Sequence, residues 1–418
     1  MASARQVALD TLRRVHRGAF SAPAVDAALR KEPLSAQDRG LVTDLVYGSL
    51  RREITLDACL RPLLKAPEGL PPEVLDALRL GSYERLFRET AGHAAVNEWV
   101  EVVKAAFPRL AGLANAVLRR VTLQEGLDEA TAAGLPGWLY QEWQGLFGPD
   151  RAARLAASGL TPQPLWLLLY RPEARASLEA EGAELTDGPL ADTVAVRSPK
   201  PLVELSAFKR GWVQAQNPSS TVPTRLLEVK AGERVLDLAG GGGVKAAQLA
   251  AAGAAVTSLD LFAKKAERGR ANLRRLGLEA TFLSHDLRTL PALEPAAKVL
   301  LDAPCTGTGT LRGHPELRTR VTEKAVHELA ALQRELLATA AMLTRPGGRL
   351  VYAVCALTRA ETVDNVRWFL DAQPDFRLIE PEPPLPAVET AEETAEGTFL
   401  LPLGGLDGFF ISVFERVC

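Results

Sequence analysis

Two cysteines follow short apolar runs, at the points where buried strands would end. Cys305 lies in Asp302–Gly309, which reads Asp-Ala-Pro-Cys-Thr-Gly-Thr-Gly and comes directly after the run 298–301. Cys355 follows the run 349–354. Ligands of open α/β sheets bind at the carboxyl ends of the strands. If the two strands are parallel neighbours, both thiols and the Asp302 carboxylate meet over one pocket. Either cysteine alone would suit a buried structural position, but the pair beside Asp302 favours catalysis.

A glycine-rich turn lies upstream of the thiols. Four glycines follow the strand-like run 234–238, Asp260 comes 17 residues after the last of them, and Asp286 follows a later apolar run. Such a turn with an acid about 20 residues on is typical of a nucleotide whose ribose is held by that acid. This pattern alone fits NAD equally well. The absence of Gly-x-Gly-x-x-Gly spacing, the further acid Asp286 and the two thiols favour S-adenosylmethionine. The predicted cofactor residues are Ala239, Gly240, Gly241, Gly242, Gly243, Val244, Lys245, Asp260, Asp286 and Asp302.

The elements that must position these residues alternate between strand and helix. From residue 216 onward, strands are expected at 234–238, 254–260 and 281–284, with helices at 244–252 and from 261 through 272. This alternation predicts a doubly wound, Rossmann-like α/β domain. The stretch 407–413 is expected to close the sheet with antiparallel strands. The acidic tract 389–396 is expected to be a solvated loop.

The preceding residues differ in character. Residues 1–125 read as all helical, with a capping box at Ser35–Asp38 and helices opening at Pro71, at Ala95 and at Leu113. Residues 126–215 read as a connector and a small α+β subdomain, with a strand at 165–170. We therefore predict three domains, at 1–125, 126–215 and 216–418.

Composition limits the class of protein. The chain has 418 residues, 47% of them hydrophobic and 24% charged, which is typical of a soluble globular protein. No apolar run reaches the roughly 18 residues that would span a membrane, and the N-terminus lacks the apolar core of a signal peptide. We expect a cytoplasmic monomer. Four cysteines without Cys-x-x-Cys spacing indicate neither a zinc site nor a disulfide framework. The net charge of −2 does not by itself predict a nucleic-acid partner.

The segment Asp302–Gly309 resembles the fourth motif of the RNA cytosine-C5 methyltransferases of the NOL/NOP2/Sun family, and Tyr352–Cys355 is similar to their sixth. Residues 95–98 and 114–120 are similar to the RNA-binding factor NusB, which precedes the catalytic domain in the RsmB branch. The resemblance implies a NusB-like domain, an RRM-like subdomain and a methyltransferase domain that acts on a cytosine of 16S ribosomal RNA. It also implies phosphate contacts from basic residues of the first domain, namely Arg5, Arg13, Arg14, Arg17, Arg119 and Arg120.

The resemblance assigns roles to the thiols. It implies that Cys355 attacks carbon 6 of the cytosine and that Cys305 assists release, while Asp302 holds ring nitrogen 3. The residues alone leave this open, because DNA cytosine methyltransferases use a Pro-Cys cysteine that resembles Cys305. Lys245 is expected to contact the substrate or to position the cofactor. His314 is expected to orient its loop or to contact RNA.

The chain departs from the family pattern in two places. The family's Cys-Ala-Ala-Pro-Gly-Gly-Lys is here Ala239–Lys245, with Gly242 in place of proline and Val244 in place of the last glycine. A loop without proline loses more entropy when it is ordered, which lowers affinity. The family's Glu-Asn-Glu after the second cysteine becomes Glu361-Thr362-Val363. Two other functions stay open at this point: a catalytically weak RNA-binding ribosome assembly factor, and a transfer-RNA cytosine-C5 methyltransferase.

Overall fold

The computed structural model describes residues 3–88, 92–380 and 391–417. They form two compact units. The first unit holds the residues up to Pro162 together with Leu311–Val321; the second holds Gln163–Thr310 and the residues from Thr322 onward. The boundaries of these units do not coincide with those predicted at residues 125 and 215. The division into three domains therefore stays a prediction. No helix in the described ranges is long and apolar enough to cross a membrane.

The first unit is helical, as the periodicity of residues 1–125 predicts. Ser3 and Ser35 cap two of its helices by accepting hydrogen bonds from the backbone amides of Gln6 and Asp38. Its core is one cluster of buried apolar side chains with Trp99 fully buried. The helices are α1 (Ala4–His16), α2 (Ser21–Lys31), α3 (Ala36–Arg51), α4 (Glu53–Leu60), α5 (Pro72–Phe87), α6 (Gly92–Ala106), α7 (Ala111–Arg120), α8 (Glu129–Ala132), α9 (Gly137–Phe147) and α10 (Pro149–Ser158), with 3-10 turns η1 (Arg61–Leu63), η2 (Pro67–Gly69) and η3 (Pro108–Leu110).

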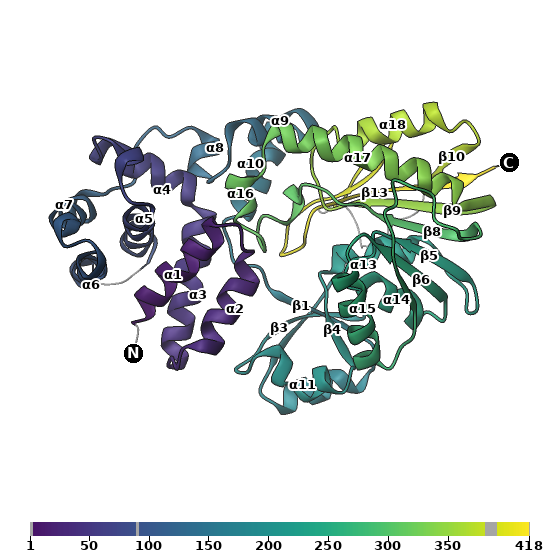
Figure 1. Cartoon of the computed structure of the whole chain (residues 1–418), viewed down its shortest axis with the longest axis horizontal. Coiled ribbons are helices and arrows are strands. Elements are labelled where there is room, and N and C mark those ends of the chain that lie inside the picture. Colours follow the sequence, from purple (N-terminus) through teal and green to yellow (C-terminus); the bar gives the residue numbers. More distant parts are fainter. Residues whose placement is uncertain (1–2, 89–91, 381–390, 418) are drawn as a thin grey trace. The chain divides into compact units, whose positions relative to one another are not determined.

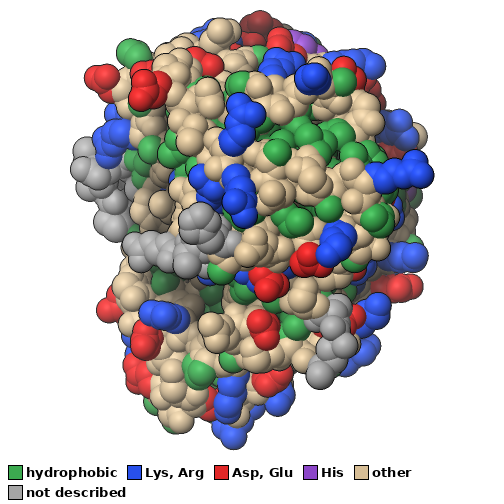
Figure 2. Space-filling model, turned by 90° about the vertical axis from the view of Figure 1, so that its left-hand side faces the viewer, with side chains coloured by type: hydrophobic (Ala, Val, Ile, Leu, Met, Phe, Trp, Pro, Cys, Tyr) green, Lys and Arg blue, Asp and Glu red, His purple; other side chains and the backbone are tan. Residues whose placement is uncertain are grey.

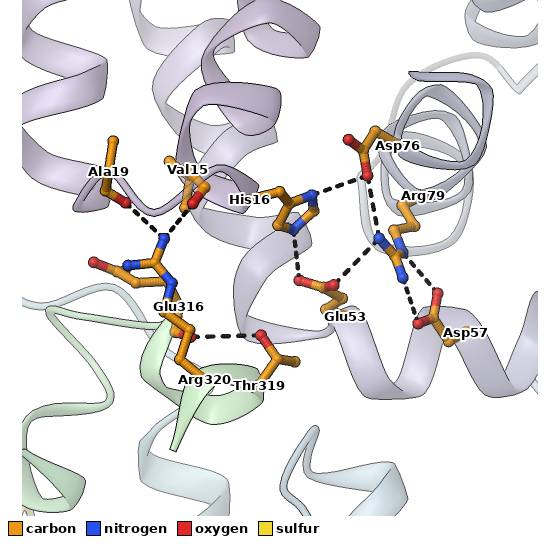
Figure 3. A network of polar contacts seen from close by, with 10 residues as sticks. All are labelled: Val15, His16, Ala19, Glu53, Asp57, Asp76, Arg79, Glu316, Thr319 and Arg320. Atoms are coloured by element: carbon orange, nitrogen blue, oxygen red, sulfur yellow. Dashed lines mark hydrogen bonds and ion pairs between the residues drawn. The ribbon is translucent and has the colours of Figure 1, made fainter. Parts of the chain in front are cut away.

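The segment Leu311–Val321, which contains α16 (Leu317–Arg320), belongs to this helical unit although it follows the Cys305 loop in sequence. The buried Arg318 donates to the carbonyl oxygens of Ala133 and Gly134, at 2.8 and 3.1 Å. Arg320 donates to the carbonyls of Val15 and Ala19, as Figure 3 shows. Buried Glu316 accepts the backbone N–H of Ser21 at 3.0 Å. Hydrogen bonds of these charged side chains thus hold the segment in place.

The second unit begins with a small antiparallel sheet in the order β2-β3-β1-β4. It confirms the strand predicted at 165–170. The sheet packs on a cluster of buried apolar residues that includes Leu167, Leu178 and Val213. Its elements are β1 (Leu165–Leu169), α11 (Glu173–Ala180), β2 (Glu184–Asp187), β3 (Thr193–Arg197), η4 (Leu202–Glu204), α12 (Ser206–Lys209) and β4 (Val213–Ala215).

The rest of the second unit is the predicted α/β domain. Its large sheet runs β11-β12-β13-β9-β8-β5-β6-β7, and β10 also pairs with β13. The strands from β9 to β7 are parallel, and β13 is antiparallel to β9, as expected for a closing strand. The strands are β5 (Arg234–Leu238), β6 (Ala255–Asp260), β7 (Thr281–Ser284), β8 (Ala296–Asp302), β9 (Thr344–Val354), β10 (Phe376–Ile379), β11 (Ala391–Thr394), β12 (Gly397–Leu400) and β13 (Phe409–Arg416).

Helices cover both faces of this sheet, which explains why its central strands are continuous apolar runs. Figure 1 shows α17 and α18 along one face and α14 and α15 along the other. Residues of β5, β8 and β9 such as Leu236, Leu300 and Val351 are fully buried. The helices are α13 (Pro218–Leu226), α14 (Val244–Ala251), α15 (Ala263–Leu276), α17 (Glu323–Met342) and α18 (Val363–Ala372), with a 3-10 turn η5 (Thr308–Thr310).

The expectation of a solvated loop at 389–396 is wrong for residues 391–394, and only residues 395–396 form a turn. Residues 391–394 form β11, which pairs antiparallel with β12 as a hairpin at the sheet edge. Two glutamates in a four-residue strand are tolerated there, because an edge strand faces solvent and its charges discourage pairing with other chains. Residues 389–390 lie outside the described residues.

His16 joins three helices of the helical unit through a charged cluster (Figure 3). Its ring nitrogens lie 3.0 Å from Asp76 and 3.1 Å from Glu53, and Arg79 bonds both of these buried acids. Burial by itself lowers the pKa of His16, but the two carboxylates outweigh it and raise the pKa from 6.5 to about 9. The imidazole is therefore protonated in the folded protein at neutral pH.

This raised pKa predicts a pH-dependent stability. The stabilisation is fully present below the unfolded-state pKa near 6.5 and is lost as pH rises through about 9. At about 1.4 kcal/mol for each pKa unit its size is at most about 3 kcal/mol, and solvent screening of the partly exposed side chain reduces it. Urea unfolding of the full chain at pH 6.5 and 9.5 measures it. The His16→Gln variant should lose this part of the pH dependence; an identical dependence in both proteins would contradict the role of His16.

Candidate active site

The two thiols meet at the carboxyl ends of β8 and β9. These strands are parallel neighbours, with Leu301 opposite Tyr352 and Asp302 opposite Ala353. Cys305 follows the first strand and Cys355 the second, and their sulfur atoms lie 3.2 Å apart. Both are free cysteines with partly exposed side chains. The structure therefore brings together the two thiols that the sequence predicted to share a pocket.

The protonation of Cys305 differs from that of an ordinary thiol. The hydrogen bond to Cys355 raises the pKa of Cys305 well above its usual value, and burial and the nearby charge of Glu361 raise it further. Cys305 thus stays a thiol at neutral pH and can donate a hydrogen bond to the sulfur of Cys355. A thiolate, not a thiol, is the nucleophile. This arrangement suits Cys355 as the attacking group and Cys305 as its donor.

Asp302 and Lys245 form an ion pair beside the thiols. Lys245 lies in the first turn of α14, and its Nζ donates to Asp302 Oδ2 at 2.6 Å and to Ser220 Oγ at 3.3 Å. Burial lowers the pKa of Lys245, but Asp302 more than compensates and the net shift is upward. The lysine is therefore a buried cation. The Asp302 side chain keeps 29% of its surface exposed, which leaves the carboxylate accessible to a ligand.

The glycine turn joins β5 to α14 in a conformation that depends on left-handed backbone. Ala239, Gly241 and Gly243 have φ values of +57°, +57° and +73°. At Gly240 a Cβ would lie 2.1 Å from Asp237 Oδ2, so no side chain fits there. Neither constraint applies to Gly242, whose Cβ would face open space. The turn keeps its backbone uncovered by side chains, as a cradle for a nucleotide requires.

Asp260 ends β6 and ties the glycine turn to the next strand. Its carboxylate accepts the N–H of Gly241 at 3.1 Å, the N–H of Phe262 at 3.0 Å and Lys265 Nζ at 3.2 Å. Leu261 and Phe262 follow it with exposed fractions of 51% and 57%. An acid next to exposed apolar side chains suits the ribose and purine of a nucleoside. Sequence reasoning missed these two apolar residues, although they directly follow the predicted ribose acid.

Two further acids near the glycine turn behave differently. Asp286 follows β7 and binds Arg288 at 2.6 Å, and this hydrogen bonding lowers the pKa of Asp286 to about 2. Its predicted contact with the cofactor stays a prediction. Asp237, which the sequence analysis did not select, lies fully buried under Gly240 and accepts Ser258 Oγ at 2.8 Å. Burial raises the pKa of Asp237 to about 7. The sequence feature that could have identified Asp237 is an acid inside an otherwise apolar run.

The backbone on both sides of Cys305 is held by two buried side chains. Gln333 of α17 donates to the carbonyl oxygen of Pro304 at 2.9 Å, and Glu361 accepts the N–H of Thr306, also at 2.9 Å. Gln333 and Glu361 bond each other at 3.0 Å. Glu361 also accepts the hydroxyls of Thr306 and Thr358. We call Gln333 and Glu361 the Cys305 clamp. The glutamate of the altered sixth motif thus has a positioning role.

The basic residues proposed to contact RNA divide into two groups. Arg5 forms a double hydrogen bond with buried Glu84, and Arg13 pairs with Glu73, so these two act within the helical unit. Figure 2 shows one face of the molecule with Lys and Arg in several separate places between apolar and acidic side chains. His314 lies 3.9 Å from Glu316 within the segment Leu311–Val321, which suits a role in that segment. The remaining four predicted contacts are exposed: Arg14, Arg17, Arg119 and Arg120.

The Cys305 clamp makes a testable contribution to stability. Glu361→Ala leaves four buried donors without their acceptor, and each orphaned buried group costs about 1–3 kcal/mol before the structure relaxes. We expect a loss of at least about 2 kcal/mol in urea unfolding. Glu361→Gln keeps one acceptor oxygen and should lose less. An alanine variant as stable as the wild type would show that the clamp bonds contribute nothing.

Known proteins resemble this chain over nearly its whole length. Residues 224–415 match the model of the 16S rRNA methyltransferase RsmB/F family, and residues 2–123 match the NusB family. A ribosomal RNA small subunit methyltransferase B from Thermus thermophilus is 44% identical over 99% of this chain and 98% of its own length. A probable methyltransferase B from Bacillus subtilis is 31% identical over 99% of both chains.

Solved structures agree with these matches in fold. The crystal structure of PH0851 has a TM-score of 0.85 and 25% identity and covers 100% of this chain and 99% of its own. NSun6 from Pyrococcus horikoshii, solved with the ligand SFG, has a TM-score of 0.61 and 21% identity over 68% of this chain and 99% of its own. The fold and the family expected from the thiol motifs are confirmed. The chain belongs to the RsmB/F family of S-adenosylmethionine-dependent rRNA methyltransferases.

Proposed function

We propose that the enzyme methylates carbon 5 of a cytosine in 16S ribosomal RNA through a covalent bond between Cys355 and carbon 6. The observation that carries the proposal is the pair of thiols 3.2 Å apart beside the Lys245–Asp302 ion pair. Relatives that cover nearly the whole chain are named as small-subunit rRNA methyltransferases, which supports this substrate. The NusB match of the helical unit fits an RNA partner.

The chemistry needs a nucleophile because carbon 5 of cytosine is too weak to attack a sulfonium. Addition of the Cys355 thiolate to carbon 6 converts the ring to an enamine that attacks through carbon 5. When bound, S-adenosylmethionine supplies the methyl group as a sulfonium. The carbon 5 proton then passes to a base, the carbon 6–sulfur bond breaks, and its electron pair returns to Cys355.

Each neighbouring residue has one task in this reaction. Asp302 holds ring nitrogen 3 of the cytosine, with Lys245 balancing the charge. Cys305 donates a hydrogen bond to the sulfur of Cys355, which stabilises the departing thiolate. The glycine turn and Asp260 bind the nucleoside part of the cofactor. The cytosine must be unpaired to reach these groups, and flipping it costs a few kcal/mol, least in a loop.

If Asp260 holds the ribose of the cofactor, its removal should lower the affinity for S-adenosylmethionine. Asp260→Ala removes the acceptor for ribose hydroxyls and the tie to Gly241, and should weaken S-adenosylmethionine binding by roughly 1.5–3 kcal/mol. Isothermal titration calorimetry measures this change. Asp187→Ala, which removes an acid with 81% exposure on the small sheet, is the matched control. If the wild type binds no S-adenosylmethionine at millimolar concentration, the cofactor site proposed here is wrong.

The proposed roles of the two thiols predict that their alanine variants behave oppositely on a denaturing gel. Cys355→Ala cannot form the covalent bond, so both methylation and any RNA–protein adduct should be absent. Cys305→Ala can still attack and methylate once, but without the hydrogen bond to the departing sulfur the adduct should accumulate as a retarded band. The samples are incubated with substrate RNA and S-adenosylmethionine before denaturation.

Cys59→Ala is the control for thiol loss, because Cys59 is buried in the core of the helical unit. Accumulation in the Cys355 variant instead would reverse the roles. Methylation that survives both substitutions, with no band in either, would remove the covalent mechanism.

A further inference from the structure

Helix α15 concentrates positive charge in a protein whose net charge is −2. Its sequence carries six basic residues and a single acidic one, Glu267, within 14 positions. The helix lies between β6 and the edge strand β7, in the catalytic unit and outside the NusB match. This local excess of positive charge in a weakly acidic chain favours the binding of an anionic partner.

The internal structure uses only part of this charge. Lys265 pairs with Asp260, and Arg275 donates to the carbonyls of Phe208 and Val213. The buried side of the helix consists of Ala266, Gly269, Leu273 and Leu276, which pack inward. The other four basic side chains are exposed: Lys264, Arg268, Arg270 and Arg274.

None of these four forms an ion pair with any acid in the part of the chain that the structure describes. Arg270 donates to the carbonyl oxygen of Phe282 at 3.0 Å, which orients its guanidinium but leaves the charge uncompensated. Glu267 lies on the same exposed side and offsets one of the four charges at most. An exposed row of uncompensated cations of this kind is typical of a surface that binds a polyanion.

A hollow lies beside the helix, and some of these basic residues line it. It has a volume of about 710 Å³ and is lined by Arg270 and Arg274 of α15, by Arg234 at the start of β5, and by the strands β6 and β7. Glu279 is the acidic residue of the lining, so arginine charge dominates. Arg234 donates to the carbonyl of Pro295 at 3.4 Å, which again leaves its charge unpaired. Arginine presents planar donors that match phosphate oxygens.

We propose that the exposed face of α15 and this hollow bind the phosphate backbone of the ribosomal RNA, outside the pocket that holds the reacting cytosine. The inference rests on the rRNA substrate proposed above. The hollow opens at the amino ends of β5, β6 and β7, whereas Asp302 and both thiols lie at carboxyl ends. A helix of 14 residues is about 21 Å long. The face thus extends RNA contact well beyond the target base and contributes to affinity, not to the chemical step.

The test compares two double variants of the full chain. Arg268→Ala with Arg274→Ala removes two exposed charges from α15. Lys324→Ala with Arg345→Ala removes two exposed charges elsewhere in the same unit and is the matched control. Binding to a 16S ribosomal RNA transcript is measured over a series of salt concentrations, and methylation of the same transcript gives KM and kcat.

The α15 variant should bind roughly tenfold more weakly near physiological salt, and the slope of log K against log salt should shrink by roughly 1.4–1.8, because each lost phosphate contact contributes roughly 0.7–0.9. Its KM should rise with kcat unchanged, and the control should match the wild type. Equal affinity and slope in both variants would overturn the proposal. So would a loss seen with assembled small subunits but not with naked transcript, because the partner would then be a ribosomal protein. A wild type that fails to methylate the transcript or the subunit would instead refute the proposed function.

Discussion

The parallel pairing of β8 with β9 is the constraint on which the proposed catalytic centre depends. Parallel neighbours end at the same edge of a sheet, so the chain leaves both strands side by side and delivers Cys305 and Cys355 to one place. A shift of the pairing by one residue would turn alternate side chains to the opposite face. Tyr352 resists such a shift, because its buried hydroxyl lies 3.0 Å from Gln333 Oε1 and 2.7 Å from the carbonyl of Glu361. The strand register and the Cys305 clamp therefore support each other.

The same catalytic loop continues into the helical unit, which affects how that unit can be studied. Removing residues 1–125 would take away the carbonyls of Val15 and Ala19 that Arg320 binds, and the amide of Ser21 that Glu316 binds. These charges belong to a segment that begins six residues after Cys305. A truncation would therefore remove the predicted RNA contacts and disturb the loop together. Substitutions at exposed arginines such as Arg119 separate the two effects.

The sequence predicts this protein best where local pattern and tertiary structure agree. The apolar runs at β5, β8 and β9 could be recognised because buried parallel strands need continuous apolar residues, and the thiols because they stand at the ends of such runs. The edge hairpin β11–β12 was missed because an acidic edge strand has the composition of a loop. The charge of α15 was missed because it is local to one helix, whereas the net charge of −2 is a sum over the whole chain. The hydrogen bonds of Gln333 could not be foreseen, because Gln333 and Pro304 are 29 positions apart.

The unusual glycine turn illustrates how geometry decides a question that sequence leaves open. The left-handed conformation falls at Ala239, Gly241 and Gly243, not at Gly242. The loss of the family's proline at position 242 therefore removes stiffness without removing a conformation that the turn requires. Bonds within the protein replace part of that stiffness: Gly243 N–H donates to the carbonyl of Gly240 at 3.1 Å, and Gly241 N–H donates to Asp260. A glycine for proline exchange costs roughly 0.4–1 kcal/mol through the entropy of the unordered chain. That is too little to abolish a nucleotide site whose shape is already fixed by its flanking strands.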